Sequence, residues 1–180
     1  MKVTDRYATA VRSSCLTVDP RTTFSDTDVL GAMGLAAREL KKEDKHSLAV
    51  ALERLFLGDN SASVEIVDAL ATKLRNKAAE DHLKMTAGQC RDVARACLAW
   101  HRHGTCRPCG GHGKLPIEGT PHLGEESCPV CMGRGQYPFE IQFREEWRGL
   151  AVWLVEFMKR EQGRAGPAAM RKLAPKLDLE

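Results

Sequence analysis

Aromatic residues are scarce in this sequence, and long apolar runs are missing. Aromatic side chains account for 6% of the 180 residues, whereas Ala, Leu, Val, Lys, Arg and Glu dominate between the glycine-rich stretches. That composition is typical of helices rather than of β-sandwiches. The hydrophobic share of 43% is large enough to form a core. We therefore expect an all-α protein.

Segments for export or membrane insertion are also missing. No stretch reaches the roughly 18 apolar residues of a membrane span, and the first residues lack the apolar run of a signal peptide. These absences predict a cytoplasmic protein without a membrane partner. In a reducing compartment, cysteines are more often metal ligands than disulfide partners.

The motifs of common catalytic sites are absent as well. The sequence has no phosphate-binding loop, no dinucleotide fingerprint and no nucleophile motif. The stretch Asp81-His82-Leu83 resembles the Asp-His pair of zinc-stapled nucleases. It lies in a predicted amphipathic helix, however, without a converging acid, base and metal-bound water. We predict that the protein is not an enzyme and keep a nuclease as the third alternative.

Four of the seven cysteines form two copies of one motif. "CRPCGGHG" at 106–113 and "CPVCMGRG" at 128–135 share the pattern Cys-x-x-Cys-x-Gly-x-Gly, and 18 residues separate the two cysteine pairs. Two residues between cysteines let one tight turn present both sulfurs to a metal, and the separation fits a four-cysteine zinc ribbon. The sequence therefore predicts one structural Zn²⁺ bound by Cys106, Cys109, Cys128 and Cys131.

Four thiolates complete a tetrahedral site and leave no position for water. We therefore interpret the zinc as structural and not as catalytic. Nearby histidines are accordingly not expected to be ligands; they are His101, His103, His112 and His122. Cys90 and Cys97 lie on the apolar face of a predicted helix, where free cysteine behaves as a small hydrophobe. We assign both to the core and give Cys15 no special role.

Hydrophobic periodicity divides the chain into four parts. Residues 1–25 are polar without an apolar period and predict a flexible N-terminal arm. Residues 26–104 predict a helical core, and residues 105–137 a zinc-binding insertion. Residues 138–180 predict a long helix that ends at Gly163, followed by a short piece and a basic tail, together completing the core.

Capping signals locate the helices of the predicted core. Ser25 or Asp26 can begin a first helix, and a second helix spans residues 43–57. A third, expected to be the longest, covers residues 61–85. Thr86 and Gln89 then form a capping box that opens the helix leading into the first cysteine motif.

The cysteine motif resembles the cysteine-rich region of J-domain co-chaperones. Those proteins carry four copies of the motif and a His-Pro-Asp sequence, whereas this chain has two copies and no His-Pro-Asp. The resemblance is local. It supports one alternative function, a zinc-stapled protein-binding adaptor without a DNA role.

A second resemblance covers about residues 20–137. "PRTTFSDTDVLGAMGLA" at 20–36, "ARACLAWHRHGTCRPCGGHG" at 94–113 and "CPVCMGRGQY" at 128–137 look like the late-gene antitermination protein Q family of lambda-type phages. The resemblance implies a factor in the bacterial cytoplasm that binds a late-promoter DNA element. It also implies a contact with RNA polymerase holding its sigma factor, and readthrough of pauses and terminators.

The resemblance implies, position by position, that the four motif cysteines correspond to the zinc ligands of the family. Basic residues around the motifs are candidates for DNA contacts on charge and location: Arg91, Arg95, Arg102, Arg107, Lys114, Arg134, Arg144 and Arg148. A solvated surface is the alternative interpretation, because Glu140, Glu145 and Glu146 interleave with these arginines.

Overall fold

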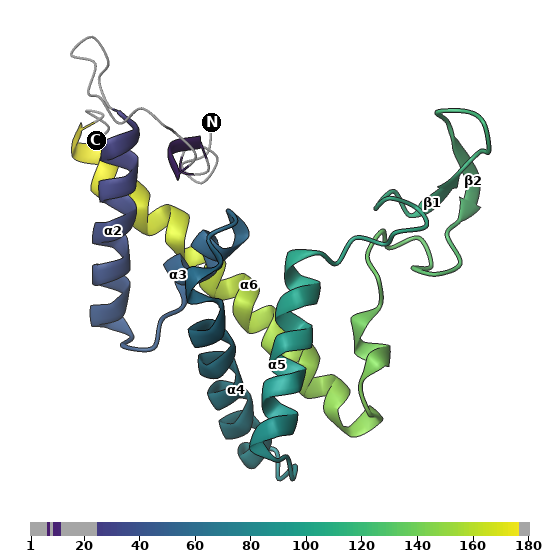
Figure 1. Cartoon of the computed structure of the whole chain (residues 1–180), viewed down its shortest axis with the longest axis horizontal. Helices are drawn as coiled ribbons and strands as arrows, with labels where there is room; N and C mark the ends of the chain where they lie inside the picture. Colours follow the sequence, from purple (N-terminus) through teal and green to yellow (C-terminus); the bar gives the residue numbers. More distant parts are fainter. Residues whose placement is uncertain (1–6, 8, 12–24, 177–180) are drawn as a thin grey trace. The chain divides into compact units, whose positions relative to one another are not determined.

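The computed structural model describes Tyr7, residues 9–11 and residues 25–176. This part of the chain is mainly helical, with one two-stranded sheet and a four-cysteine cluster in a loop region (Figure 1). The predicted fold class is therefore confirmed. Within the predicted N-terminal arm, Tyr7 and residues 9–11 are helical, and Tyr7 and Ala10 are buried. The rest of the arm before residue 25, including Cys15, lies outside the described residues.

The chain forms two compact units whose boundaries fall inside helices. The first unit comprises Met1–Ala69 and Glu156–Glu180, and the second comprises Leu70–Val155. Helices α4 (Ser63–Glu80) and α6 (Glu145–Leu173) each contribute to both units. None of the described helices combines the length and apolar character that crossing a membrane requires.

The first unit contains α2 (Asp26–Glu43), α3 (Ala49–Phe56) and the 3₁₀ turns η1 (Asn60–Ala62) and η3 (Ala174–Lys176), besides its parts of α4 and α6. Helix α2 begins after Ser25, whose backbone N–H and hydroxyl both donate to the Asp28 carboxylate, at 2.9 and 3.0 Å. The apolar stripe of α2 packs against small residues of α6. This core includes Val29, Ala32, Met33, Ala36, Leu40, Ala165, Ala168, Ala169 and Leu173.

The basic tail is partly neutralised by acids of α2. Glu39 forms ion pairs with Arg171 and Lys172, and Glu43 pairs with Arg164 at 3.2 Å. These cations therefore have partners within the first unit, and the tail is less available for phosphates than its charge alone indicates.

The predicted end of the last helix at Gly163 is wrong. Helix α6 runs through Gly163 and Pro167 to Leu173, over 29 residues. A proline inside a helix removes one backbone donor and clashes with the preceding turn. Here the residues after Gly163 bury three alanines and Leu173 in the core of the first unit. Tertiary packing thus overrides the local stop signals.

Helix α4 is also shorter than predicted, with 18 residues, and it ends at Glu80. His82 takes the left-handed conformation, with φ of 57°. The N–H of Leu83 then donates to the carbonyl of Ala78 at 2.8 Å, which is the bond of a Schellman cap. Asp81 pairs with Lys77 at 2.8 Å. The Asp81-His82 stretch therefore ends a helix.

The second unit contains α5 (Ala87–Arg102), the cysteine loop with β1 (Lys114–Pro116) and β2 (Leu123–Ser127), and η2 (Phe139–Gln142). The predicted capping box opens α5: Thr86 N–H donates to the Gln89 side chain at 2.8 Å, and Gln89 N–H donates to the Thr86 hydroxyl at 3.2 Å. Helix α5 then leads directly into the cysteine loop (Figure 1). That rigid helix fixes where the loop begins.

Cys90 and Cys97 belong to the core of the second unit, as predicted. Both are buried, and burial raises the pKa of the Cys97 thiol to about 12. The Cys97 Sγ lies 3.8 Å from the carbonyl oxygen of Ala151 in α6. Neither cysteine belongs to the group that could hold a metal, so we assign both to packing.

Candidate metal centre

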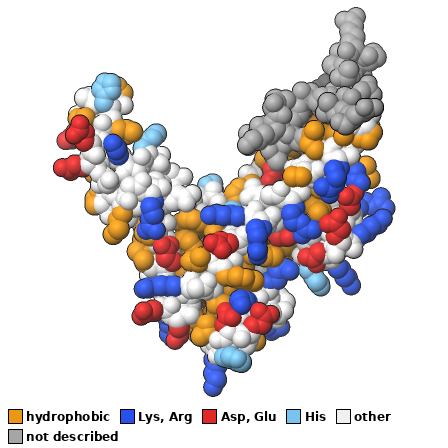
Figure 2. Space-filling view, turned by 180° about the vertical axis from the view of Figure 1, so that it is seen from behind, with side chains coloured by type: hydrophobic (Ala, Val, Ile, Leu, Met, Phe, Trp, Pro, Cys, Tyr) orange, Lys and Arg blue, Asp and Glu red, His pale blue; other side chains and the backbone are white. Residues whose placement is uncertain are grey.

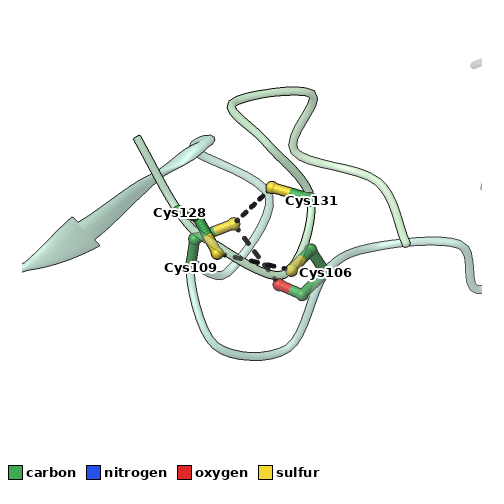
Figure 3. A group of neighbouring side chains, drawn as sticks. All are labelled: Cys106, Cys109, Cys128 and Cys131. Carbon is green, nitrogen blue, oxygen red and sulfur yellow. Dashed lines mark hydrogen bonds between the residues drawn. The ribbon is translucent and has the colours of Figure 1, made fainter. Parts of the chain in front are cut away.

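The four motif cysteines converge on one point. Cys106, Cys109, Cys128 and Cys131 are all buried, with exposed fractions of 2% or less. Their sulfur atoms all lie within 4.8 Å of one another (Figure 3). In the part of the chain that the structure describes, this is the one group of three or more metal-ligating side chains that gathers in this way. The cluster can hold a metal ion.

The sulfur spacing fits a tetrahedral metal site and excludes disulfides. Cys106 and Cys128 have their sulfurs 3.9 Å apart, and Cys109 and Cys131 have theirs 3.7 Å apart. Four sulfurs bonded at about 2.3 Å to a tetrahedral ion are separated by about 3.8 Å, whereas a disulfide bond is about 2.05 Å long. All four cysteines are free. The donor set and its geometry therefore suit a metal ion that prefers thiolates.

The two motifs build the centre by exchanging backbone hydrogen bonds. Cys106 N–H donates to the carbonyl of Gly135 at 2.9 Å, and Cys128 N–H donates to the carbonyl of Gly113 at 2.7 Å. The first cysteine of each motif is thus held by the last glycine of the other. This reciprocal pairing gives the loop a local two-fold symmetry that follows from the duplicated sequence.

Gly113 and Gly135 are required at these two positions for steric reasons. Their φ angles are 75° and 71°, in the left-handed region that glycine adopts most readily. A Cβ added to Gly113 would lie 2.3 Å from the Gly133 carbonyl oxygen, and one added to Gly135 would lie 2.2 Å from the Gly111 oxygen. No larger residue fits without moving the backbone that carries the cysteines.

Met132 marks a difference between the two motifs at a variable position of the shared pattern. Its φ of 51° matches the 57° of Gly110, the equivalent residue of the first motif. A non-glycine residue in this conformation costs roughly 1–2 kcal/mol. The Met132 side chain is also 78% exposed. The second motif thus tolerates strain at a position where the first motif has glycine.

Backbone N–H groups prepare the cluster for thiolates. Burial raises the pKa of Cys109, but hydrogen bonds with the N–H groups of Gly113 and Gly111 and with the Cys106 and Cys131 thiols together lower it. Gly135 N–H donates similarly to the Cys131 sulfur at 3.3 Å. Burial raises the pKa of Cys106. Neighbouring thiols cannot all ionise without a cation, so metal binding must displace protons.

The hairpin between the two motifs is acidic. Strands β1 and β2 pair antiparallel, with Lys114 opposite Ser127 and Pro116 opposite Leu123. Residues 115–127 include three glutamates and no lysine or arginine. Leu115, Ile117 and Leu123 are exposed at 37%, 50% and 43%. The part of the hairpin after Lys114 is therefore unsuited to contact phosphates.

Five of the eight predicted DNA-contacting residues, Arg91 among them, already have an interaction in the structure. Arg95 pairs with Asp92 at 3.3 Å, and Arg134 pairs with Glu140 at 3.2 Å. The Arg144 guanidinium lies 5.0 Å from the centre of the Trp147 ring, and Arg148 donates to the carbonyl of Phe143 at 3.3 Å. Arg91 is exposed on α5. Paired cations can still meet phosphates, but they must first leave a local partner.

The remaining three, Arg102, Arg107 and Lys114, have no side-chain hydrogen bond or ion pair among the described residues. Arg102 ends α5, Arg107 lies inside the first motif, and Lys114 begins β1. Elsewhere on the face shown in Figure 2, blue Lys and Arg side chains alternate with red Asp and Glu side chains. The three candidates without a partner among the described residues therefore lie beside the metal loop.

Aromatic residues that the sequence analysis did not single out brace the base of the loop. The Trp100 indole N–H donates to the carbonyl of Tyr137 at 2.7 Å. The Trp100 ring lies 4.3 Å from that of Phe139, centre to centre. Tyr137 N–H in turn donates to the carbonyl of Gly104 at 2.9 Å. The sequence signal for this contact was a Trp shortly before the first cysteine motif and a Tyr shortly after the second.

No family model, curated protein or solved structure matches the chain. The metal centre consequently rests on its own geometry. The resemblance to the antitermination family stays a prediction from the sequence.

Proposed function

We propose that this chain is a zinc-stabilised transcription antitermination factor of the phage or prophage type, without catalytic activity. It would bind a late-promoter DNA element and RNA polymerase with its sigma factor, and change elongation so that pauses and terminators are passed. The observation that carries the proposal is a four-cysteine cluster that can hold a metal, with Arg102, Arg107 and Lys114 beside it and without partners among the described residues.

Zinc is the metal that best suits this donor set. Four buried sulfurs at tetrahedral spacing match the preference of Zn²⁺ for thiolates. A site closed by four protein ligands has no position for a reactive water. The metal would therefore act as a staple for a loop that has little apolar burial of its own.

The positive charge beside the loop supports a contact with nucleic acid. Phosphates attract lysine and arginine, and the release of counterions makes that attraction salt-dependent. Arg102, Arg107 and Lys114 meet this requirement without first breaking a contact among the described residues. Simultaneous contacts with polymerase would raise the effective concentration of the protein at the promoter.

The test is transcription in vitro with purified components. The template carries the promoter region downstream of this protein's own gene and a terminator beyond it. We expect readthrough to rise with zinc-loaded protein and to fall to background with metal-stripped protein. Normal termination in the presence of folded, zinc-loaded protein would contradict the proposal.

One observation favours the adaptor as second candidate. The hairpin β1–β2 exposes Leu115, Ile117 and Leu123 among glutamates, which suits a protein partner better than a phosphate backbone. Salt separates the two functions. A DNA complex loses affinity steeply as salt rises, whereas an apolar protein contact does not.

A further inference from the structure

A hollow of about 550 Å³ opens in the second unit beside the metal loop. It lies between the end of α5, the start of the first motif and the segment that follows the second motif. Ligand pockets typically have volumes of about 300–1,000 Å³. The hollow therefore has room for a small planar molecule.

Half of the residues that line the hollow are apolar or aromatic. Ala96, Ala99, Trp100 and Tyr137 line it. The Trp100 ring is held by its hydrogen bond to the Tyr137 carbonyl and by its contact with Phe139. Tyr137 keeps 39% of its surface exposed. The site thus presents an accessible ring on a base that is already rigid.

The other half of the lining residues are polar. They are His103, Thr105, Arg107 and Gln142. Among the described residues, none of these four side chains forms a hydrogen bond or an ion pair. Arg107 stands between Cys106 and Cys109, so metal binding fixes its backbone. No acidic residue lines the hollow.

This combination matches the chemistry of a nucleotide. Aromatic side chains stack on base faces, unpaired donors and acceptors suit base edges, and a guanidinium suits a phosphate. The faces of a base in a duplex are covered by its neighbours, so a stacking side chain reaches them only when the base is unpaired. The absence of carboxylates agrees with an anionic ligand.

We infer that the hollow between α5 and the metal loop binds one unpaired nucleobase and its adjoining phosphate. Tyr137 stacks on the base, and Arg107 contacts the phosphate. The inference deepens the proposed nucleic-acid function and rests on it for the source of the strand. Nucleotide chemistry is shared by a single-stranded nucleic acid and a free mononucleotide, and the experiment separates them.

The test measures fluorescence anisotropy with zinc-loaded full-length protein. The probes are a fluorescein-labelled oligothymidylate of about 12 nucleotides, the same strand annealed to its complement, and AMP as an unlabelled competitor. At matched salt, we expect the single strand to bind more tightly than the duplex. Tyr137→Ala should weaken strand binding by about 5- to 100-fold, and Tyr137→Phe should retain it because the ring remains.

Controls keep this result specific to the hollow. Arg107→Ala should weaken strand binding and reduce its salt dependence, whereas Arg75→Ala should change it little, because Arg75 is exposed on α4 and does not line the hollow. Zinc content and circular dichroism establish that each variant is folded. Displacement of the strand by millimolar AMP, lost in Tyr137→Ala, would support the same hollow with a free nucleotide as ligand.

The inference would be overturned if the protein bound strand and duplex with equal affinity and if Tyr137→Ala bound the strand as tightly as the wild type. The transcription assay distinguishes this failure from failure of the proposed function. Readthrough that survives Tyr137→Ala would leave antitermination intact without the base site. Strand binding that depends on Tyr137 in a protein without readthrough would leave the base site intact without antitermination.

Discussion

The carboxylate of Glu161 in α6 accepts the backbone N–H of Leu48 at 2.9 Å, although 113 positions separate the two residues. Leu48 is the N-cap of α3, which has no side-chain cap of its own. Glu161 also accepts the Ser47 hydroxyl at 3.0 Å and an Arg164 N–H at 2.7 Å. A buried carboxylate of one helix therefore caps another helix of the first unit.

Replacing Glu161 by Gln should destabilise the first unit by about 2 kcal/mol at pH 7, because hydrogen bonds to a buried charge are lost. Burial raises the pKa of Glu161, but Arg164, the Leu48 N–H and the Ser47 hydroxyl outweigh it and lower the pKa below 4.5. The stabilisation is thus complete above that value and disappears as pH falls through the folded pKa.

Urea denaturation of wild type and Glu161→Gln at pH 7 and at pH values below 4.5 checks this prediction. The difference between the two proteins should shrink in acid. Glu43→Gln is the matched control, because Glu43 pairs with the same Arg164 but its side chain is 52% exposed. A constant difference across pH would contradict the role assigned to the Glu161 charge.

Gly113→Ala should weaken zinc binding by at least tenfold, since its Cβ would meet the Gly133 carbonyl oxygen at 2.3 Å. Gly119→Ala provides the control: Gly119 has a similar φ of 74°, but a Cβ there meets nothing within 4 Å. Competition with a chromogenic zinc chelator measures both. Equal losses in the two variants would mean that the left-handed backbone, and not the contact between motifs, sets the affinity.

Met132→Gly should leave zinc affinity unchanged or raise it severalfold. The substitution removes the left-handed strain of about 1 kcal/mol and restores the residue type found at Gly110. The same chelator competition measures the effect. Weaker zinc binding would show that the Met132 side chain contributes contacts that its exposure does not suggest.

Cys106→Ser should abolish stoichiometric zinc while most helical signal remains, because the helices pack through apolar faces away from the loop. Metal analysis and far-ultraviolet circular dichroism test the two parts separately. Cys97→Ser is the control for a buried thiol outside the cluster, and it should lower thermal stability but keep the zinc. Full zinc content in Cys106→Ser would remove Cys106 from the ligand set.

Arg107→Ala should weaken duplex DNA binding and lower the slope of log affinity against log salt by about 1. Arg134→Ala should have the smaller effect, because Glu140 already neutralises Arg134 at 3.2 Å. Binding isotherms at several salt concentrations compare the two. A larger effect at Arg134 would indicate that the Glu140 pair opens on binding and that phosphates approach from the second motif.

Features with a local cause were predictable from the sequence. The capping box at Thr86 and Gln89 depends on four consecutive residues only, and both of its hydrogen bonds are present. The cysteine pairs gather as their spacing predicts, because each tight turn presents two sulfurs regardless of the rest of the chain.

Features that depend on distant partners were not predictable. Gly163 and Pro167 favour a helix end, but the alanines beyond them are buried against α2. Glu161 caps α3 by accepting the Leu48 N–H, and no sequence pattern near Leu48 indicates this contact. Gly113 and Gly135 are needed because the backbone of the opposite motif approaches them closely, and neither motif alone indicates that contact.

The reciprocal bonds between the two motifs make the loop equivalent to a small homodimer tied into one chain. Each half completes the backbone hydrogen bonds of the other, so we expect the two halves to assemble cooperatively. The acidic hairpin then serves only to connect the two halves. The entropic cost of closing such a connection grows only slowly with its length. Hairpins of other lengths and sequences could therefore be exchanged there, so that contact specificity changes while the metal centre stays intact.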